Sequence, residues 1–299
     1  MANWNWRNNL TAWFLGLVVL GLTFWAYLPA LLVFGYRWTI EPDYIHGFLV
    51  IPFAAALLWM RRDMLRDGPG RPSWWGLLLA IGGAGTWLLG GSRGSPALVG
   101  LSLVPLLWGV ALFVGGTRTL RWSWPATAFL AFMIPLPPAM AEWLRGPLRE
   151  IGANCGVFII QMLGLAADAE GTTIHLRGGE LGVADVCSGV RMMMLFFAVC
   201  VGAALVLEAK PWEKAVIVVS AIPIAVVSNV LRITITALLH ELAGAELADR
   251  VFHDLAGWLM MPLAIVLLMG ELTLIRQVIQ TDRQSGSGDA CTPAEASGG

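Results

Sequence analysis

The sequence has little charge. Only 13% of its 299 residues are charged, against about 25% in a typical soluble domain, and 57% are hydrophobic. The 19 Lys and Arg residues nearly balance the 20 Asp and Glu residues, so there is neither a basic excess for nucleic acid nor an acidic excess for disorder. Four cysteines do not make a disulfide scaffold. These shortages exclude a soluble globule and a nucleic-acid partner, and they favour one membrane bundle.

Long apolar runs dominate the chain. Because a helix needs about 20 apolar residues to cross a bilayer, we predict an all-α polytopic membrane protein with about eight transmembrane helices. Residues 1–280 are predicted to form one membrane domain, and residues 281–299, rich in Ser and Gly, a disordered cytoplasmic tail. The predicted crossings are Ala12–Phe34, Ile45–Met60, Trp74–Leu89, Ala97–Val114, Trp122–Leu136, Val190–Leu207, Ala215–Leu239 and Leu255–Ile275.

Positive charge indicates the orientation of the bundle. The short loop after the second predicted crossing carries Arg61, Arg62, Arg66 and Arg71. Loops on the cytoplasmic side of a membrane carry an excess of Lys and Arg. We therefore predict a multi-pass protein of the inner (cytoplasmic) membrane with both termini in the cytoplasm.

The longest stretch without a predicted crossing is Pro137–Cys187, on the outer side. Its first part, Ala139–Leu165, has the mixed apolar and polar pattern of a helix lying along the membrane interface. Its second part alternates polar and apolar residues over Thr172–Arg177 and continues through Gly178-Gly179 to Ala184. This pattern predicts a small extracytoplasmic β-hairpin with a Gly-Gly turn.

The predicted topology gathers reactive side chains on the outer face of the membrane. Cys187 opens the sixth crossing, Arg232 lies in the outer half of the seventh, His253 precedes the eighth, and His46 opens the second. A thiol, a cation and an imidazole at one depth provide a nucleophile, an electrophilic group and a base.

Cys187 is the predicted nucleophile. The N-terminus of a helix carries partial positive charge, which favours the thiolate, and Arg191 lies one turn further on the same face. The alternative is a small buried hydrophobic residue followed by the capping residue Ser188. A disulfide with Cys155 is a further alternative and would abolish the nucleophile.

Arg232 stands within a long apolar segment. An unpaired arginine at the bilayer centre costs about 2.5–3.5 kcal/mol on insertion scales, so such a residue indicates a functional site by default. Asn229 is three residues earlier on the same helix face. In the alternative, Arg232 is a structural cation that pairs with Glu241 or Asp185.

His253 is the predicted acid and base. An imidazole can take a proton from a thiol and return it to a leaving amine, and Asp249 or Asp185 could orient the ring. The alternative is a polar residue that caps a helix, and His240 is a competing base. His46 is predicted to line the same cavity, although a polar residue at this interfacial position needs no function.

No metal or cofactor is expected. The four His and four Cys residues are scattered, and neither the HExxH nor the CxxC pattern occurs. The phosphate-binding loop and the dinucleotide-binding fingerprint are absent as well.

Four segments together resemble the exosortase/archaeosortase family of polytopic membrane transpeptidases. Their order and spacing are also similar, and the resemblance runs from about Trp38 to Ile275. The matching segments are Tyr44-Ile45-His46-Gly47-Phe48-Leu49-Val50-Ile51-Pro52, Ala184-Asp185-Val186-Cys187-Ser188-Gly189-Val190-Arg191, Asn229-Val230-Leu231-Arg232-Ile233 and His253-Asp254-Leu255-Ala256-Gly257.

The resemblance implies a cysteine protease and transpeptidase with an extracytoplasmic site. Cys187 would be the nucleophile, Arg232 the group that stabilises the oxyanion, and His253 the acid and base. The partners would be secreted proteins of PEP-CTERM type, whose C-terminal sorting signal has a short motif, a membrane helix and a basic cluster. The acceptor would be a lipid or polysaccharide amine, or water.

Some residues depart from the family's pattern, and other functions stay open. The run Met192-Met193-Met194 is bulkier than expected, and Tyr44 and Ile45 replace small residues. A transporter would also have an intramembrane arginine, although the sequence has no clear half-to-half symmetry. A non-catalytic membrane subunit of a polysaccharide-export system, or a silent relative that only binds sorting signals, is a further alternative.

Overall fold

The computed structural model describes residues 6–66, 68–177, 179–182 and 189–244, together with residues 266, 267, 269, 270 and 273. The chain divides into two compact units. The first unit comprises Met1–Leu148 and Val190–Ala198, and the second comprises Arg149–Gly189 and Val199–Gly299. The predictions for Cys187, Asp185, His253 and the tail 281–299 lie outside the described residues.

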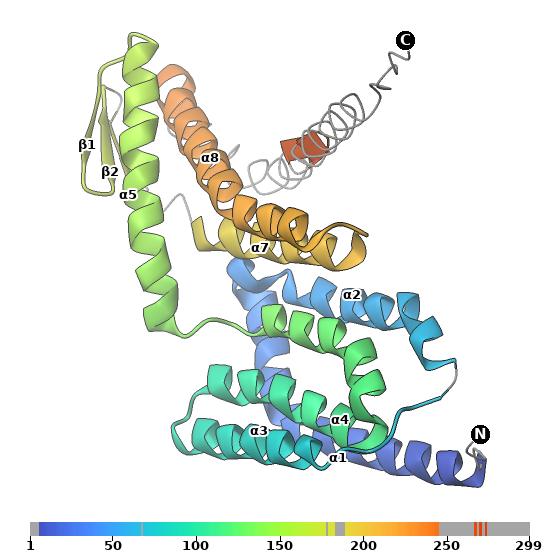
Figure 1. The fold of residues 1–299 in the computed structure, drawn as a ribbon. Helices are drawn as coiled ribbons and strands as arrows, with labels where there is room; N and C mark the ends of the chain where they lie inside the picture. The colour runs from blue at the N-terminus through green and yellow to red at the C-terminus, as the bar shows by residue number, and fades with distance from the viewer. Residues whose placement is uncertain are drawn as a thin grey trace, which may run out of the picture. The chain divides into compact units, whose positions relative to one another are not determined.

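The first unit is helical. The long helix α1 (Trp6–Ile40) is followed by α2 (Gly47–Met60), α3 (Trp75–Ser92) and α4 (Pro96–Phe129). Short 3-10 turns at Pro42–Tyr44, Arg62–Leu65 and Leu130–Met133 are labelled η1, η2 and η3 in chain order. Figure 1 shows α3 and α4 lying side by side, and these two helices form the most extensive helix contact of the unit.

Glycines bring α3 and α4 together. Gly76, Gly83 and Gly90 recur every seven residues of α3, and all three are buried. A Cβ atom at Gly83 would lie 2.7 Å from the backbone nitrogen of Leu106, and one at Gly90 would lie 2.7 Å from that of Val99. Small residues allow helix backbones to approach this closely, which is the usual packing of membrane helices.

The fourth and fifth predicted crossings differ from what is observed. Ala97–Val114 and Trp122–Leu136 were expected as separate helices, whereas α4 runs through both and bends at Gly116. Gly116 has φ 63° and ψ −165°, a conformation that glycine adopts without strain. Residues 96–115 and 117–129 are therefore two helical segments joined by one residue, rather than by a loop.

The second unit holds most of α5 (Pro138–Met162), the C-terminal part of α7 (Gly189–Val206), and α8 (Pro211–Ala243). It also contains an antiparallel sheet of β1 (Ala167–Glu170), β2 (Thr173–Leu176) and β3 (Gly179–Gly182), in the order β1-β2-β3. Figure 1 shows α8 beside α5 and the strands near the end of α5.

The sheet differs in detail from the predicted hairpin. A third strand, β1, precedes the two expected ones and pairs with β2. Gly179 pairs with Leu176 as the first residue of β3, so it belongs to the strand rather than to the turn. One face of the sheet is apolar, because Ile174, Leu176 and Leu181 are buried. These residues form one core with apolar residues of α5 and α8.

The fold is that of a helical membrane protein. Among the described residues, three helical stretches are long and apolar enough to cross a bilayer: Leu17–Ile40, Pro96–Met133, which contains the bend at Gly116, and Pro211–Ala243. Large apolar side chains also point outward, such as Trp25 on α1, which is 74% exposed, and Leu78 on α3, which is 61% exposed. Such surfaces need lipid or another apolar partner. The number of eight crossings stays a prediction.

Candidate functional site

Buried polar side chains follow one face of α8. Asn229 and Arg232 are 2% and 6% exposed, and Thr236 and His240 are also buried. Residues spaced by three or four positions share one face of a helix. The Thr236 hydroxyl donates to the carbonyl of Arg232 at 2.9 Å. The structure thus places the predicted pair Asn229 and Arg232 together, on a helix that has the length and apolarity of a membrane span.

The helix α5 packs directly against this part of α8. Gly152 and Gly156 are buried, and both face Ile233, the residue that follows Arg232. A Cβ atom at Gly152 would contact the Ile233 Cδ1 atom and would lie 3.0 Å from the Asn229 amide nitrogen. Because Gly152 and Gly156 have no side chains, the polar face of α8 can approach the backbone of α5 closely. The sequence analysis had assigned this helix only to the membrane interface.

The competing base His240 lies at the other end of the same face. A Cβ atom at Gly179 of β3 would be 3.6 Å from His240 Cε1. The ring is buried, and its Nδ1 atom has no hydrogen-bond partner among the described residues. At 1.5 Å rise per residue, His240 is about 12 Å from Arg232 along the helix axis. The two residues are thus about two helical turns apart on one face of α8.

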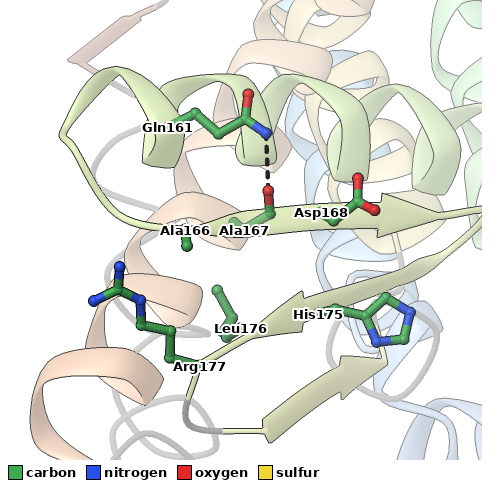
Figure 2. A pocket seen from close by; sticks show the side chains of 7 residues that line it. All are labelled: Gln161, Ala166, Ala167, Asp168, His175, Leu176 and Arg177. Carbon is green, nitrogen blue, oxygen red and sulfur yellow. Dashed lines mark hydrogen bonds between the residues drawn. The ribbon is translucent and has the colours of Figure 1, made fainter.

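A shallow depression of about 530 Å³ lies beside the end of α5 and the strands β1 and β2 (Figure 2). The Gln161 amide donates to the carbonyl of Ala167 at 2.8 Å and closes one side of it. His175 projects from β2, with Nδ1 3.3 Å from Glu180 and Nε2 3.6 Å from Glu170. The His175 side chain is 37% exposed, so it is in contact with solvent.

His46 lies in the first unit and has a structural contact. Its Nε2–H donates to the carbonyl of Phe132 in η3 at 3.1 Å, and the residue is 4% exposed. Burial lowers the pKa of His46, and hydrogen bonds to the backbone of Phe132 and Asp43 oppose this shift only in part. His46 is therefore a neutral ring that holds η3 beside the start of α2. The sequence analysis did not foresee this contact.

The helix α7 follows the predicted nucleophile Cys187 in the sequence. This helix begins at Gly189, two residues after Cys187, and includes Arg191 in its first turn. Cys155 is a free, exposed thiol on α5. The polar face of α8 is thus the part of the predicted site whose geometry is described.

Apolar helices of membrane length place this chain in the class of helical membrane proteins. It is a member of the transmembrane exosortase family, whose model matches residues 38–270. This match confirms the resemblance found in the sequence, and membership implies a membrane transpeptidase in general. No curated protein and no solved structure matches the chain.

Proposed function

We propose that this protein is a cysteine transpeptidase that removes the C-terminal sorting signal of secreted proteins and transfers them to an acceptor. The observation that carries the proposal is the family match, because residues 38–270 include Cys187, Arg232 and His253. The burial of Arg232 on α8 supports it, because a charged side chain in an apolar segment is energetically costly and indicates a functional site by default.

The proposed reaction has two steps. The Cys187 thiolate attacks the scissile carbonyl, and the C–N bond breaks as His253 gives a proton to the leaving amine. The product is a thioester between the substrate and Cys187. An amine or hydroxyl of a lipid or polysaccharide acceptor then attacks the thioester, loses its proton to His253, and releases the thiolate.

Arg232 has the electrostatic role in this proposal. Its charge is permanent, and in a site of low dielectric constant it stabilises the negative oxygen of the tetrahedral intermediate strongly. Because the burial of Asn229 and Arg232 fixes their side chains before substrate arrives, little reorganisation is needed during the reaction. Helix α7 begins at Gly189, two residues after Cys187 in the sequence, and a helix N-terminus favours the thiolate form of a neighbouring cysteine.

The proposed substrate reaches the site along the membrane. The apolar helix of the sorting signal would lie in the bilayer beside the bundle, and the short motif would emerge at the outer boundary. Tethering in two dimensions raises the effective concentration of the motif before any side chain binds it. We accordingly propose an inner-membrane location with an extracytoplasmic site and cytoplasmic termini.

Processing of a reporter tests the proposed function. A secreted reporter with a C-terminal PEP-CTERM-type signal is co-expressed with wild type, Cys187→Ala or Cys155→Ala. Cys155 is the matched control because it is a free, exposed cysteine. We expect wild type and Cys155→Ala to shorten the reporter and Cys187→Ala to leave it intact. Equal processing by Cys187→Ala would refute the proposal, whereas a transporter would depend on Arg232 and not on Cys187.

A further inference from the structure

The contact between α5 and the polar face of α8 identifies a residue that sequence motifs did not. We propose that Gly152 is a positioning residue of the transpeptidase site, because its missing side chain fixes the place of the Asn229 amide beside Arg232. This inference rests on the proposed function. Gly152 has no functional group of its own, so its effect on the reaction must act through the side chains that it contacts, Ile233 and Asn229.

Two glycines on α5 face α8, and they meet different atoms. A Cβ atom at Gly152 would touch Ile233 Cδ1 and would lie 3.0 Å from the Asn229 amide nitrogen. A Cβ atom at Gly156 would lie 3.1 Å from Ile233 Cγ2 and 3.6 Å from the Thr234 hydroxyl. Both glycines therefore pack on Ile233, but only Gly152 borders Asn229.

The position of the Asn229 amide is tightly constrained. The residue is 2% exposed, so a displaced amide cannot simply turn into open space. A carbon at 3.0 Å would force it to move by a few tenths of an ångström. Asn229 and Arg232 are three residues apart, and side chains at this spacing are neighbours on a helix. A displaced Asn229 amide would therefore change the immediate surroundings of the Arg232 guanidinium.

The structure also supplies a way to separate packing from positioning. Gly152→Ala alone presses on both Ile233 and Asn229. Ile233→Val removes the Cδ1 atom, after which the nearest Ile233 atom to the new Cβ is Cγ1 at 3.9 Å, an ordinary contact. The double variant Gly152→Ala/Ile233→Val therefore keeps only the contact with Asn229. Gly156→Ala is the matched control, because its Cβ atom would crowd Ile233 without contacting Asn229.

The experiment measures cleavage of the PEP-CTERM-type reporter in proteoliposomes at several reporter concentrations, together with the thermal midpoint of each variant. A displacement of about 1 Å can cost about 100-fold in rate, so a few tenths of an ångström should lower kcat of the double variant about tenfold. We expect its KM and thermal midpoint to equal those of Ile233→Val. Gly156→Ala and Ile233→Val should retain the kcat of wild type.

A second comparison uses Asn229→Ala as the background. If Gly152 acts through the amide, adding Gly152→Ala/Ile233→Val to Asn229→Ala should lower kcat no further. The proposal is overturned if the double variant has the kcat of Ile233→Val, if Gly156→Ala loses as much activity, or if the loss persists in the Asn229→Ala background. If the double variant keeps the kcat of Ile233→Val while Cys187→Ala is inactive, the positioning role is refuted and the proposed function stands. Full activity of Cys187→Ala would refute the proposed function.

Discussion

Arg145 and Asp43 are 102 residues apart in the chain, and the Arg145 guanidinium donates to the Asp43 carboxylate at 3.0 Å. The Asp43 side chain is 12% exposed and that of Arg145 is 26% exposed. A pair this sheltered leaves a poorly solvated charge when one partner is removed. We expect Asp43→Asn to lower the free energy of unfolding by about 1–3 kcal/mol, measured by denaturant titration in detergent.

An exposed pair in the same unit is the control for this prediction. Arg66 lies 3.0 Å from Asp63, but their side chains are 77% and 61% exposed. Exposed ion pairs contribute little, because solvent screens them. Asp63→Asn should leave the free energy of unfolding unchanged. An equal loss in the two variants would show that burial does not set the strength of the Asp43 pair.

His46 predicts a pH dependence of stability. Burial lowers the pKa of the folded protein's His46 below its ordinary value of 6.5, so the unfolded chain binds the proton more readily. The contribution of His46 to stability is therefore complete above pH 6.5 and declines as the pH falls through that value towards the lowered pKa. Thermal midpoints of wild type and His46→Gln, compared from about pH 8 to about pH 5, check this expectation.

The Gln side chain retains a donor for the carbonyl of Phe132 but does not titrate. We expect the midpoint of wild type to fall more steeply with acid than that of His46→Gln. Parallel curves would mean that His46 keeps an ordinary pKa in the folded protein.

Gly116 and Gly94 separate backbone strain from crowding. They have φ values of 63° and 59°, so alanine is strained at either position. Nothing lies within 4 Å of a Cβ atom at Gly94, whereas one at Gly116 would collide with the backbone carbonyl of Arg71. We expect Gly94→Ala to cost about 1 kcal/mol of unfolding free energy and Gly116→Ala about 3 kcal/mol. Similar losses would refute the close approach of Arg71 to the bend in α4.

The proposed role of Arg232 requires the planar set of N–H donors of the guanidinium and not only its positive charge. Arg232→Lys keeps a cation but loses the planar guanidinium, and a single lost oxyanion donor typically costs about 100-fold or more in kcat. We expect a loss of about 100-fold in reporter cleavage with little change in KM. Arg93→Lys, at an exposed position, is the control and should behave as wild type. Full activity of Arg232→Lys would leave the guanidinium without a role in the reaction.

The sequence predicted the helices well where apolar runs are uninterrupted. The observed α2, Gly47–Met60, differs from the predicted Ile45–Met60 by two residues at its start. The bend in α4 was placed only roughly, because apolar periodicity does not show that Gly116 turns the chain within one residue. The strand β1 was missed because Ala167–Glu170 has no β-branched or aromatic residue, and its pairing with β2 is not visible in its own sequence.

Of the candidate site, only relationships between neighbouring residues of one helix could be predicted. The pair Asn229 and Arg232 follows from helix spacing, and the structure places both on the buried face of α8. The packing of Gly152 on that face could not be predicted, because it depends on which side of α5 meets α8. The contact of His46 with Phe132 joins residues 86 positions apart, which no local pattern reveals.

Trapping the acyl-enzyme tests the central claim most directly. Wild-type protein is incubated in proteoliposomes with the PEP-CTERM-type reporter and without an acceptor, quenched in acid, and digested for mass spectrometry. We expect the reporter's cleaved end to be attached to the peptide that contains Cys187 and to be released by hydroxylamine. Shortened reporter with no thioester at Cys187, under conditions in which acyl-cysteine standards survive, would contradict the account.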